Sequence, residues 1–370
     1  IITAIENRIP KVEIYLMAYY PVNYEAAAEN MKECLKIRNN EKIAAANKEV
    51  EKLAAKHGQK YIDINKNLKG SIMLLVTSLI WGTAFVAQSE GMNYVEPFTY
   101  NAMRTLLGGI VLIPVILLFR FLDKRNGKEK TNYSLKNTVI GGLCCGAALF
   151  VASSFQQSGI ALTTAGKAGF VTALYIVIVP IIGIFLHRKM PLKMWLFVAL
   201  ALVGFWLLCI KQNFSISSGD MLVFVGAVFF AVHITVIDHF NGKETDGVIM
   251  SCIQFFTAGL LMLICMFIFE KPAVSNIIGA GGTILYAGIM SCGVAYTLQI
   301  LGQKHTNPTL ATMLMSLESV FAALSGWLIL GEKLSVKEFF GCVLIFAAVI
   351  LAQLAGTDKK QKNEMDGEVK

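Results

Sequence analysis

The chain has 370 residues, of which 55% are hydrophobic and 16% charged, and its mean hydropathy is +0.59. This composition excludes a soluble enzyme for most of the chain. Lys and Arg outnumber Asp and Glu by 33 to 25, and the formal net charge of +8 would suit nucleic acid or a membrane surface. The basic residues lie between hydrophobic blocks, which favours the membrane and argues against nucleic acid.

The composition changes abruptly near Leu68. Residues 1–67 are of mixed polarity and predict a strand over 12–17, a helix across 43–54 and a second strand over 60–64. We expect a short α/β fragment here, too small to bury a core alone.

The segment IYLMAYYPVN, followed by RNNEKIAAANKEVEKLAAKHGQKYIDIN, resembles the late part of SGNH (GDSL-type) esterases. That resemblance implies a nucleophilic Ser with Asp and His partners, because a serine hydroxyl is a weak nucleophile without a neighbouring base. Neither the GDS segment nor the closing DxxH occurs in the sequence. We therefore expect residues 1–67 to be a truncated, inactive hydrolase-like piece. The sequence leaves open whether it is a real domain or the result of a frameshift, a fusion or an assembly artefact.

The rest of the chain consists mostly of apolar residues and contains ten mainly apolar stretches. Several of them have about the length of roughly 20 residues that a transmembrane helix needs. They cover residues 71–89, 98–119, 138–158, 165–186, 194–210, 221–237, 248–269, 277–301, 309–330 and 339–355. The predicted fold class is an all-α membrane protein with ten transmembrane helices, preceded by the short α/β fragment.

Loop charges predict the orientation. Lys and Arg concentrate in alternate loops, most of all between residues 120 and 136 and between 188 and 193. Because such loops stay preferentially on the cytoplasmic side, we expect both termini in the cytoplasm, including a charged tail over 357–370.

The two halves of the hydrophobic part resemble each other. The segment from Gly70 to Leu74 aligns with Gly219 to Val223 at an offset of 149, and Gln156 to Thr163 aligns with Gln299 to Thr306 at an offset of 143. We divide the chain into repeats at 68–211 and 212–356. Because each repeat has five spans, an odd number, the second must enter the membrane upside down, as in transporters that work by alternating access.

Three segments, LIWGTAFVAQ, PFTYNAMRTLLGG and PTLATMLMSLESVFAALSGWLILGEKLSVKEFFGCVLIFAAVILA, resemble EamA-type transporters of the drug/metabolite transporter superfamily. The resemblance implies two inverted five-helix halves, residence in the bacterial plasma membrane, and transport of amino acids or other metabolites, commonly outward. The sequence has no Walker motif, zinc pattern or dinucleotide loop, so we expect no cofactor, no metal site and no enzymatic activity.

Charged side chains inside spans need a reason, because each costs about 2.5–3.5 kcal/mol on insertion scales. These are Arg104, Lys167 and Glu318. Asn101, Arg104, Gln156 and Lys167 all fall in the outer third of their spans. We expect Arg104, Gln156 and Lys167 to form a cationic cluster that attracts a carboxylate, since Arg offers a forked, permanently charged donor.

The repeat predicts a second polar vestibule on the inner side. Arg104 maps onto Gln254, Gln156 maps onto Gln299, and position 84 maps onto His233. Between the vestibules we expect a cavity with aromatic walls, suited to a small amphipathic metabolite. Its predicted lining is Trp81, Phe85, Tyr175, Tyr296 and Glu318.

Structural roles remain open for several of these residues. Lys167 is close enough to the surface to extend its amine to the lipid headgroups. Arg104 could anchor a neighbouring helix, and His233 could be a neutral helix-packing residue. The aromatic residues could face lipid or core. Burial disfavours a charged carboxylate, so Glu318 could carry a proton.

We therefore expect a permease that exports a small amphipathic solute, with amino acids as the leading class and protons as a possible partner. The alternatives are a multidrug, nucleoside or sugar permease of the same superfamily, a uniporter or lipid-like carrier without ion coupling, and a remnant hydrolase on a membrane anchor. The sequence leaves monomer and homodimer equally open.

Overall fold

The computed structural model describes residues 15–17, 60–62, 64–125, 133–163, 165–187, 191–209, 217–330 and 335–366. The chain divides into two units. One comprises residues 70–353, and the other comprises residues 1–69 together with 354–370. The candidate site lies entirely in the first of these, which we call the helical unit.

The N-terminal part of the other unit contains two short strands. β1 (Tyr15–Met17) pairs in parallel with β2 (Lys60–Ile62), with Tyr15 opposite Lys60. Both strands fall within the segments that the sequence predicts as strands. The predicted helix between them lies outside the described residues, so the α/β fragment stays a prediction.

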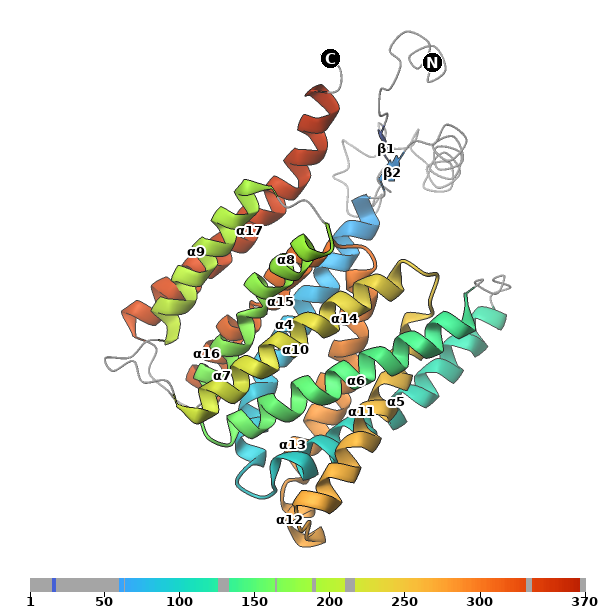
Figure 1. Ribbon diagram of the computed structural model, residues 1–370, viewed down its shortest axis with the longest axis vertical. Coiled ribbons are helices and arrows are strands. Elements are labelled where there is room, and N and C mark those ends of the chain that lie inside the picture. Colours follow the sequence, from blue (N-terminus) through green and yellow to red (C-terminus); the bar gives the residue numbers. More distant parts are fainter. Residues whose placement is uncertain are drawn as a thin grey trace, which may run out of the picture. The chain divides into compact units, whose positions relative to one another are not determined.

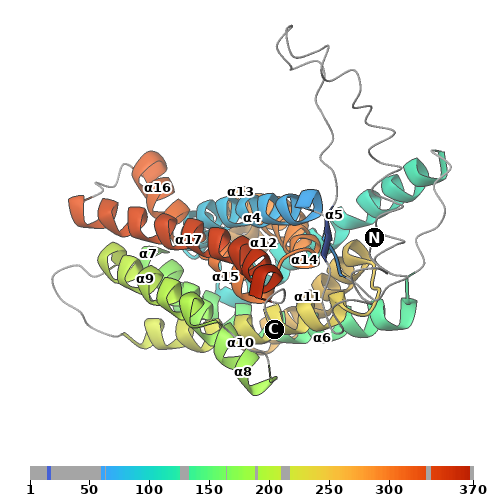
Figure 2. The same ribbon diagram turned by 90° about the horizontal axis from the view of Figure 1, so that it is seen from above.

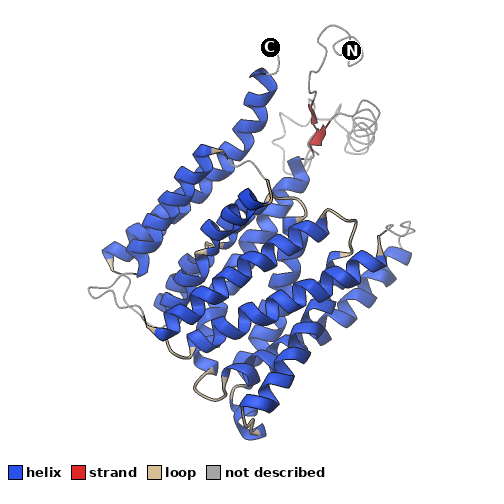
Figure 3. Ribbon diagram, in the orientation of Figure 1, coloured by secondary structure: helices blue, strands red, loops and turns tan. Residues whose placement is uncertain are grey.

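The helical unit contains two successive sets of helices (Figures 1 and 3). The first set is α4 (Ile64–Gly91), α5 (Pro97–Arg125), α6 (Leu135–Ile160), α7 (Ala165–Ala173), α8 (Tyr175–Phe185) and α9 (Leu192–Cys209). The second set is α10 (Ser218–Asn241), α11 (Gly247–Phe269), α12 (Val274–Gly279), α13 (Gly281–Tyr286), the π-helix η1 (Ala287–Tyr296), α14 (Thr297–Gln303), α15 (Pro308–Met315), α16 (Glu318–Leu330) and α17 (Val336–Asp366).

Within the described residues, eight helical segments are long and apolar enough to cross a membrane. They coincide with the predicted spans one to four and six to nine. Two shorter apolar helices, Leu192–Leu207 and Phe339–Ala352, occupy the places of the fifth and tenth spans. That these two helices also cross the membrane, which would make ten spans, stays a prediction. Figures 1 and 2 show α9 and α17 side by side, and Gly204 of α9 contacts Ile345 of α17.

Local sequence explains where several helices begin. Ser217 and Asp220 form a capping box at the start of α10, in which each side chain accepts a hydrogen bond from the other residue's backbone N–H. The Asp246 side chain accepts from the backbone N–H groups of Val248 and Ile249, both at 3.0 Å, at the start of α11. Asn307 caps α15, whose first residue is Pro308.

The connections define two ends of the helical unit. At end A, helices α4, α6 and α11 finish and α5, α7 and α10 begin. At end B, α5, α8, α10 and α14 finish and α6, α11 and α15 begin. Equivalent helices of the two sets therefore run in opposite directions, which is the predicted inversion.

Two glycine contacts show the repeat in three dimensions. At end B, a methyl group on Gly302 would lie 3.0 Å from the Gly70 carbonyl oxygen, against Leu74. At end A, a methyl group on Gly159 would lie 2.6 Å from the Gly219 carbonyl oxygen, against Val223. The offsets of 143 and 149 relate all members of the first contact to those of the second. Only glycine permits these backbone approaches.

Candidate functional site

The fourth span of each repeat is broken at an equivalent residue. α7 ends at Ala173 and α8 begins at Tyr175, whereas α15 ends at Met315 and α16 begins at Glu318. The offset of 143 relates Tyr175 to Glu318. Irregular backbone at membrane depth is tolerated where it is buried in protein or lines a cavity, so the two breaks mark the centre of the unit as a candidate site.

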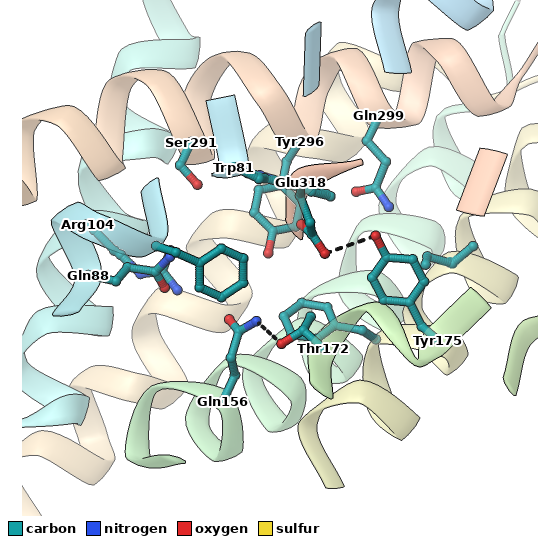
Figure 4. Close-up of a pocket in the computed structure, with 13 residues that line it drawn as sticks. Trp81, Gln88, Arg104, Gln156, Thr172, Tyr175, Ser291, Tyr296, Gln299 and Glu318 are labelled. Atoms are coloured by element: carbon teal, nitrogen blue, oxygen red, sulfur yellow. Dashed lines mark hydrogen bonds between the residues drawn. The ribbon is translucent and has the colours of Figure 1, made fainter. Parts of the chain in front are cut away.

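A cavity lies at these breaks (Figure 4). It leaves about 30 Å³ for the centres of water molecules, enough for about two of them. The lining includes eight residues predicted from the sequence, namely Trp81, Phe85, Arg104, Gln156, Tyr175, Tyr296, Gln299 and Glu318. It also includes five that the sequence did not indicate, namely Gln88, Thr172, Phe230, Ile234 and Ser291.

Glu318 is the acidic side chain of this cavity. It is 3% exposed, and the Tyr175 hydroxyl donates to its Oε1 at 3.0 Å. No ion-pair partner for Glu318 occurs among the described residues. A buried carboxylate held by one neutral hydroxyl is available to a cation that enters the cavity.

Arg104 is the basic side chain, and it is also 3% exposed. Its Nε donates to Asn101 Oδ1 at 2.8 Å, and Asn101 Nδ2 donates to the Ser153 carbonyl at 2.9 Å. The guanidinium carbon lies 5.9 Å from the centre of the Tyr100 ring. Asn101 does not line the cavity; it positions Arg104 against α6. Figure 4 shows Arg104 beside Gln88, away from Glu318 and Tyr175.

The walls between the two charges are aromatic and amide side chains. The Trp81 and Tyr296 rings meet edge to face with their centres 4.7 Å apart. Gln156 Nε2 donates to Thr172 Oγ1 at 3.0 Å. Among the described residues, Trp81 Nε1 and Gln299 Oε1 have no hydrogen-bond partner. The cavity thus offers a donor and an acceptor beside its apolar surface.

Lys167 does not join Arg104 and Gln156, so the predicted cationic cluster does not form. Lys167 Nζ instead pairs with Asp220 Oδ2 at 3.5 Å, and its side chain is 37% exposed. Asp220 Oδ1 also accepts from Thr163 at 2.6 Å. Asp220, at the start of α10, had no predicted role, and its carboxylate draws Lys167 towards end A.

His233 and Gln254 also lie outside the cavity lining. Both are fully buried, and His233 Nε2 and Gln254 Oε1 are 3.0 Å apart. The His233 ring packs edge to face on Tyr296, with the centres 6.0 Å apart. They join α10 to α11 behind the cavity, so the packing role fits them better than the predicted inner vestibule.

Three of the unanticipated lining residues had a signal in the sequence. Phe230 and Ile234 are related to Trp81 and Phe85 by the offset of 149. Gln88 follows Trp81 and Phe85 at helical spacing, so it shares their face of α4. Thr172 and Ser291 had none, because one precedes a helix break and the other lies in a π-helix. Within the described ranges, no three His, Cys, Asp or Glu side chains come together in a way that could hold a metal ion.

Comparison with solved structures supports the fold. A crystal structure that is 19% identical superposes with a TM-score of 0.62, over 77% of this chain and 96% of that chain. At this identity the likeness concerns the fold alone.

Several curated relatives cover the hydrophobic part of the chain. An uncharacterized transporter of Archaeoglobus fulgidus is 29% identical over 291 residues, which is 78% of this chain and 87% of that protein. The uncharacterized inner membrane transporter YedA of Escherichia coli is 26% identical, over 76% of this chain and 89% of its own length. The uncharacterized transporter YoaV of Bacillus subtilis is 22% identical, over 77% and 96%.

The model of the EamA-like transporter family matches the chain twice, over residues 68–210 and 217–354. The two matches coincide with the two sets of helices and begin at the composition change near Leu68. The esterase resemblance of residues 1–67 receives no support from these comparisons. The chain belongs to the EamA-like transporter family and is a multi-pass membrane transporter.

Proposed function

We propose that the chain is an alternating-access permease that exports small zwitterionic metabolites, with amino acids as the leading class. One observation carries this proposal: two buried side chains of opposite charge, Arg104 and Glu318, line the same cavity without an ion-pair partner among the described residues. Buried charges are costly unless they are paired, so a solute that supplies both opposite charges would stabilise both.

The chemistry of the lining assigns a place to each part of such a solute. The guanidinium of Arg104 matches a carboxylate, with which it forms charge-assisted hydrogen bonds. Glu318, oriented by Tyr175, matches an ammonium group. The rings of Trp81 and Tyr296 offer an apolar surface for the side chain of the solute. The cavity has room for only about two water molecules, so these walls must separate when the solute binds.

Glu318 also provides a route for energy coupling. An ionised Glu318 can bind the ammonium of the solute. When Glu318 is protonated instead, the empty site can change its access from one side of the membrane to the other without the solute. Because one carboxylate does not hold both cations, movement of the solute in one direction is exchanged for a proton in the other. We propose proton antiport on this basis, with residence in the bacterial plasma membrane and both termini in the cytoplasm, as the loop charges predict.

The test is counterflow in proteoliposomes that contain the full chain. Vesicles loaded with unlabelled amino acids, nucleosides, sugars or a cationic drug would be diluted into trace radiolabelled solute of the same kind. The proposal expects saturable accumulation for one or more amino acids. Exchange of a nucleoside, a sugar or the drug, with none for amino acids, would overturn it.

A further inference from the structure

Buried amide side chains lie immediately beyond the central cavity at end A. Gln88 lines the cavity and is 5% exposed, and Gln157 of α6 is fully buried. Gln157 Nε2 donates to the Gln88 carbonyl at 3.4 Å, which joins α6 to α4. The side-chain oxygens of both residues have no hydrogen-bond partner among the described residues. We call these two residues the end A amide pair.

Met92 and Ile160 follow Gln88 and Gln157 by about one helical turn towards end A, where a second pocket lies. Met92, which follows α4, lines that pocket, and so does Ala161, whose N–H donates to the Gln157 carbonyl at 3.1 Å. Met92 packs in one apolar cluster with Phe85 of the central cavity and with Ile160. A solute that leaves the cavity towards end A therefore meets the amides first and the Met92–Ile160 layer second.

The repeat relates the amide pair and the apolar layer of end A to two layers at end B, where the apolar layer comes first and the amides second. The offsets of 149 and 143 relate Gln88 and Gln157 to Ile237 and Ile300, which are both fully buried in one apolar cluster. This apolar layer lies next to the cavity, where end A has its amides.

The same offsets relate Met92 and Ile160 to Asn241 and Gln303, which we call the end B amide pair. Asn241 Nδ2 donates to the Ile300 carbonyl at 2.9 Å, one turn before Gln303. Asn241 Oδ1 and both polar atoms of the Gln303 side chain have no partner among the described residues. End B thus also carries amide side chains with buried polar atoms, on a half-buried Asn241 and a buried Gln303, but one layer further from the cavity.

Buried polar atoms are rarely left without a hydrogen bond, because an unpaired one loses its hydrogen bonds to water and gains none in return. Amide groups can donate to a carboxylate and accept from an ammonium, so they suit a zwitterion in transit. We propose that the two amide pairs are the gates of the central cavity, one at each end, and that the solute exchanges hydrogen bonds with each pair as it passes. The inference rests on the proposed alternating access. It adds three solute-contact residues outside the central cavity, Gln157, Asn241 and Gln303, and gives a gating role to Gln88, which lines the cavity.

The test measures access to the cavity and needs no substrate. Ser291 lines the cavity and is 2% exposed, so Ser291→Cys introduces a small reporter thiol there. A membrane-impermeant, positively charged methanethiosulfonate reagent is applied to the full chain in vesicles of known sidedness. Mass spectrometry then quantifies the labelling of residue 291 from each face.

Two double variants are compared in the reporter background. Gln88→Ala with Gln157→Ala should raise the labelling rate at least tenfold from one face of the membrane. Asn241→Ala with Gln303→Ala should raise it from the opposite face. Ile237→Ala with Ile300→Ala is the matched control for location, since these residues occupy the repeat-equivalent positions of the end A pair at end B, and should act from the same face as the end B pair.

Folding is checked by size exclusion and thermal unfolding in detergent, and the single alanine variants replace any double variant that does not fold. Gln88→Leu with Gln157→Leu keeps the bulk and should leave labelling at or below the reporter rate. Unchanged labelling in both alanine pairs, or an increase from the same face for both, would overturn the proposal. A negative amino acid counterflow with this labelling pattern would reject the substrate class and retain the gates.

Discussion

Tyr175 and Glu318 occupy equivalent positions in the two inverted repeats and are hydrogen-bonded to each other at 3.0 Å. Each is the first residue after the break in its fourth span. Symmetry-related residues of the two halves therefore come together at the candidate site. The cavity is lined largely by such pairs: Trp81 with Phe230, Phe85 with Ile234, and Gln156 with Gln299. The charge of Glu318 has no counterpart at Tyr175, so the solute enters a site whose two halves differ chemically.

Replacing the carboxylate should uncouple transport. Glu318→Gln is expected to abolish the stimulation of solute exchange by an imposed pH gradient, because an amide side chain does not take up and release a proton as a carboxylate does. Tyr175→Phe removes only the hydroxyl that holds Glu318 and should keep the stimulation while weakening apparent affinity. Uptake into proteoliposomes with and without the gradient measures both. Persistent stimulation in Glu318→Gln would remove this residue from the coupling mechanism.

Replacing the guanidinium should weaken solute binding. Arg104→Gln is expected to raise the half-saturating solute concentration by about 10- to 100-fold, since a charge-assisted hydrogen bond contributes about 1.5–3 kcal/mol. The control is Arg120→Gln, an exposed residue near the end of α5 whose side chain contacts Tyr133. Concentration-dependent counterflow measures both variants. Equal effects would show that Arg104 has no special role at the site.

The Lys167–Asp220 ion pair at end A should contribute less to stability than the capping box of Asp220 with Ser217. Lys167→Ala is expected to lower the free energy of unfolding by less than about 1 kcal/mol, because the pair is partly exposed. Asp220→Ala should cost about 1–2 kcal/mol, because Asp220 also accepts from the Ser217 N–H and the Thr163 hydroxyl. Thermal unfolding in detergent compares them, and a larger loss for Lys167→Ala would contradict the assignment.

The two glycine contacts should be sensitive to a single methyl group. Gly302→Ala and Gly159→Ala are each expected to destabilise the chain by about 1–3 kcal/mol, because the methyl group meets the backbone of the adjoining helix. Gly281→Ala is the matched control, since nothing lies within 4 Å of a methyl group there. If all three alanine variants unfold at the same temperature, the close approaches do not contribute to stability.

Most of the helical unit followed from sequence pattern. Span length and hydrophobicity predicted the eight long helical segments, and an odd number of spans in each repeat predicted the inversion. The apolar helical segments of the fifth and tenth spans are shorter, and the prediction that they cross the membrane stays a prediction. The break before Tyr175 and the π-helix around Ser291 leave no mark on hydrophobic periodicity, because both keep the same apolar composition.

The site was predictable where the repeat and helical spacing constrained it. Arg104 and Glu318 were identified because charged residues at membrane depth are unusual. Trp81 was identified because aromatic walls suit an amphipathic solute. Lys167 was misplaced because its partner Asp220 begins a span of the other repeat, and such a contact depends on packing between helices. The buried pairing of His233 with Gln254 is likewise a matter of tertiary packing.

We propose that Arg104 and Glu318 together recognise a zwitterion. The most direct test is counterflow of one aromatic amino acid against its amide, which lacks the carboxylate, and its deaminated acid, which lacks the amine. We expect the amino acid to compete at least tenfold better than either analogue, and Arg104→Gln to remove the discrimination against the amide. Equal competition by all three compounds in the unmodified chain would contradict the claim.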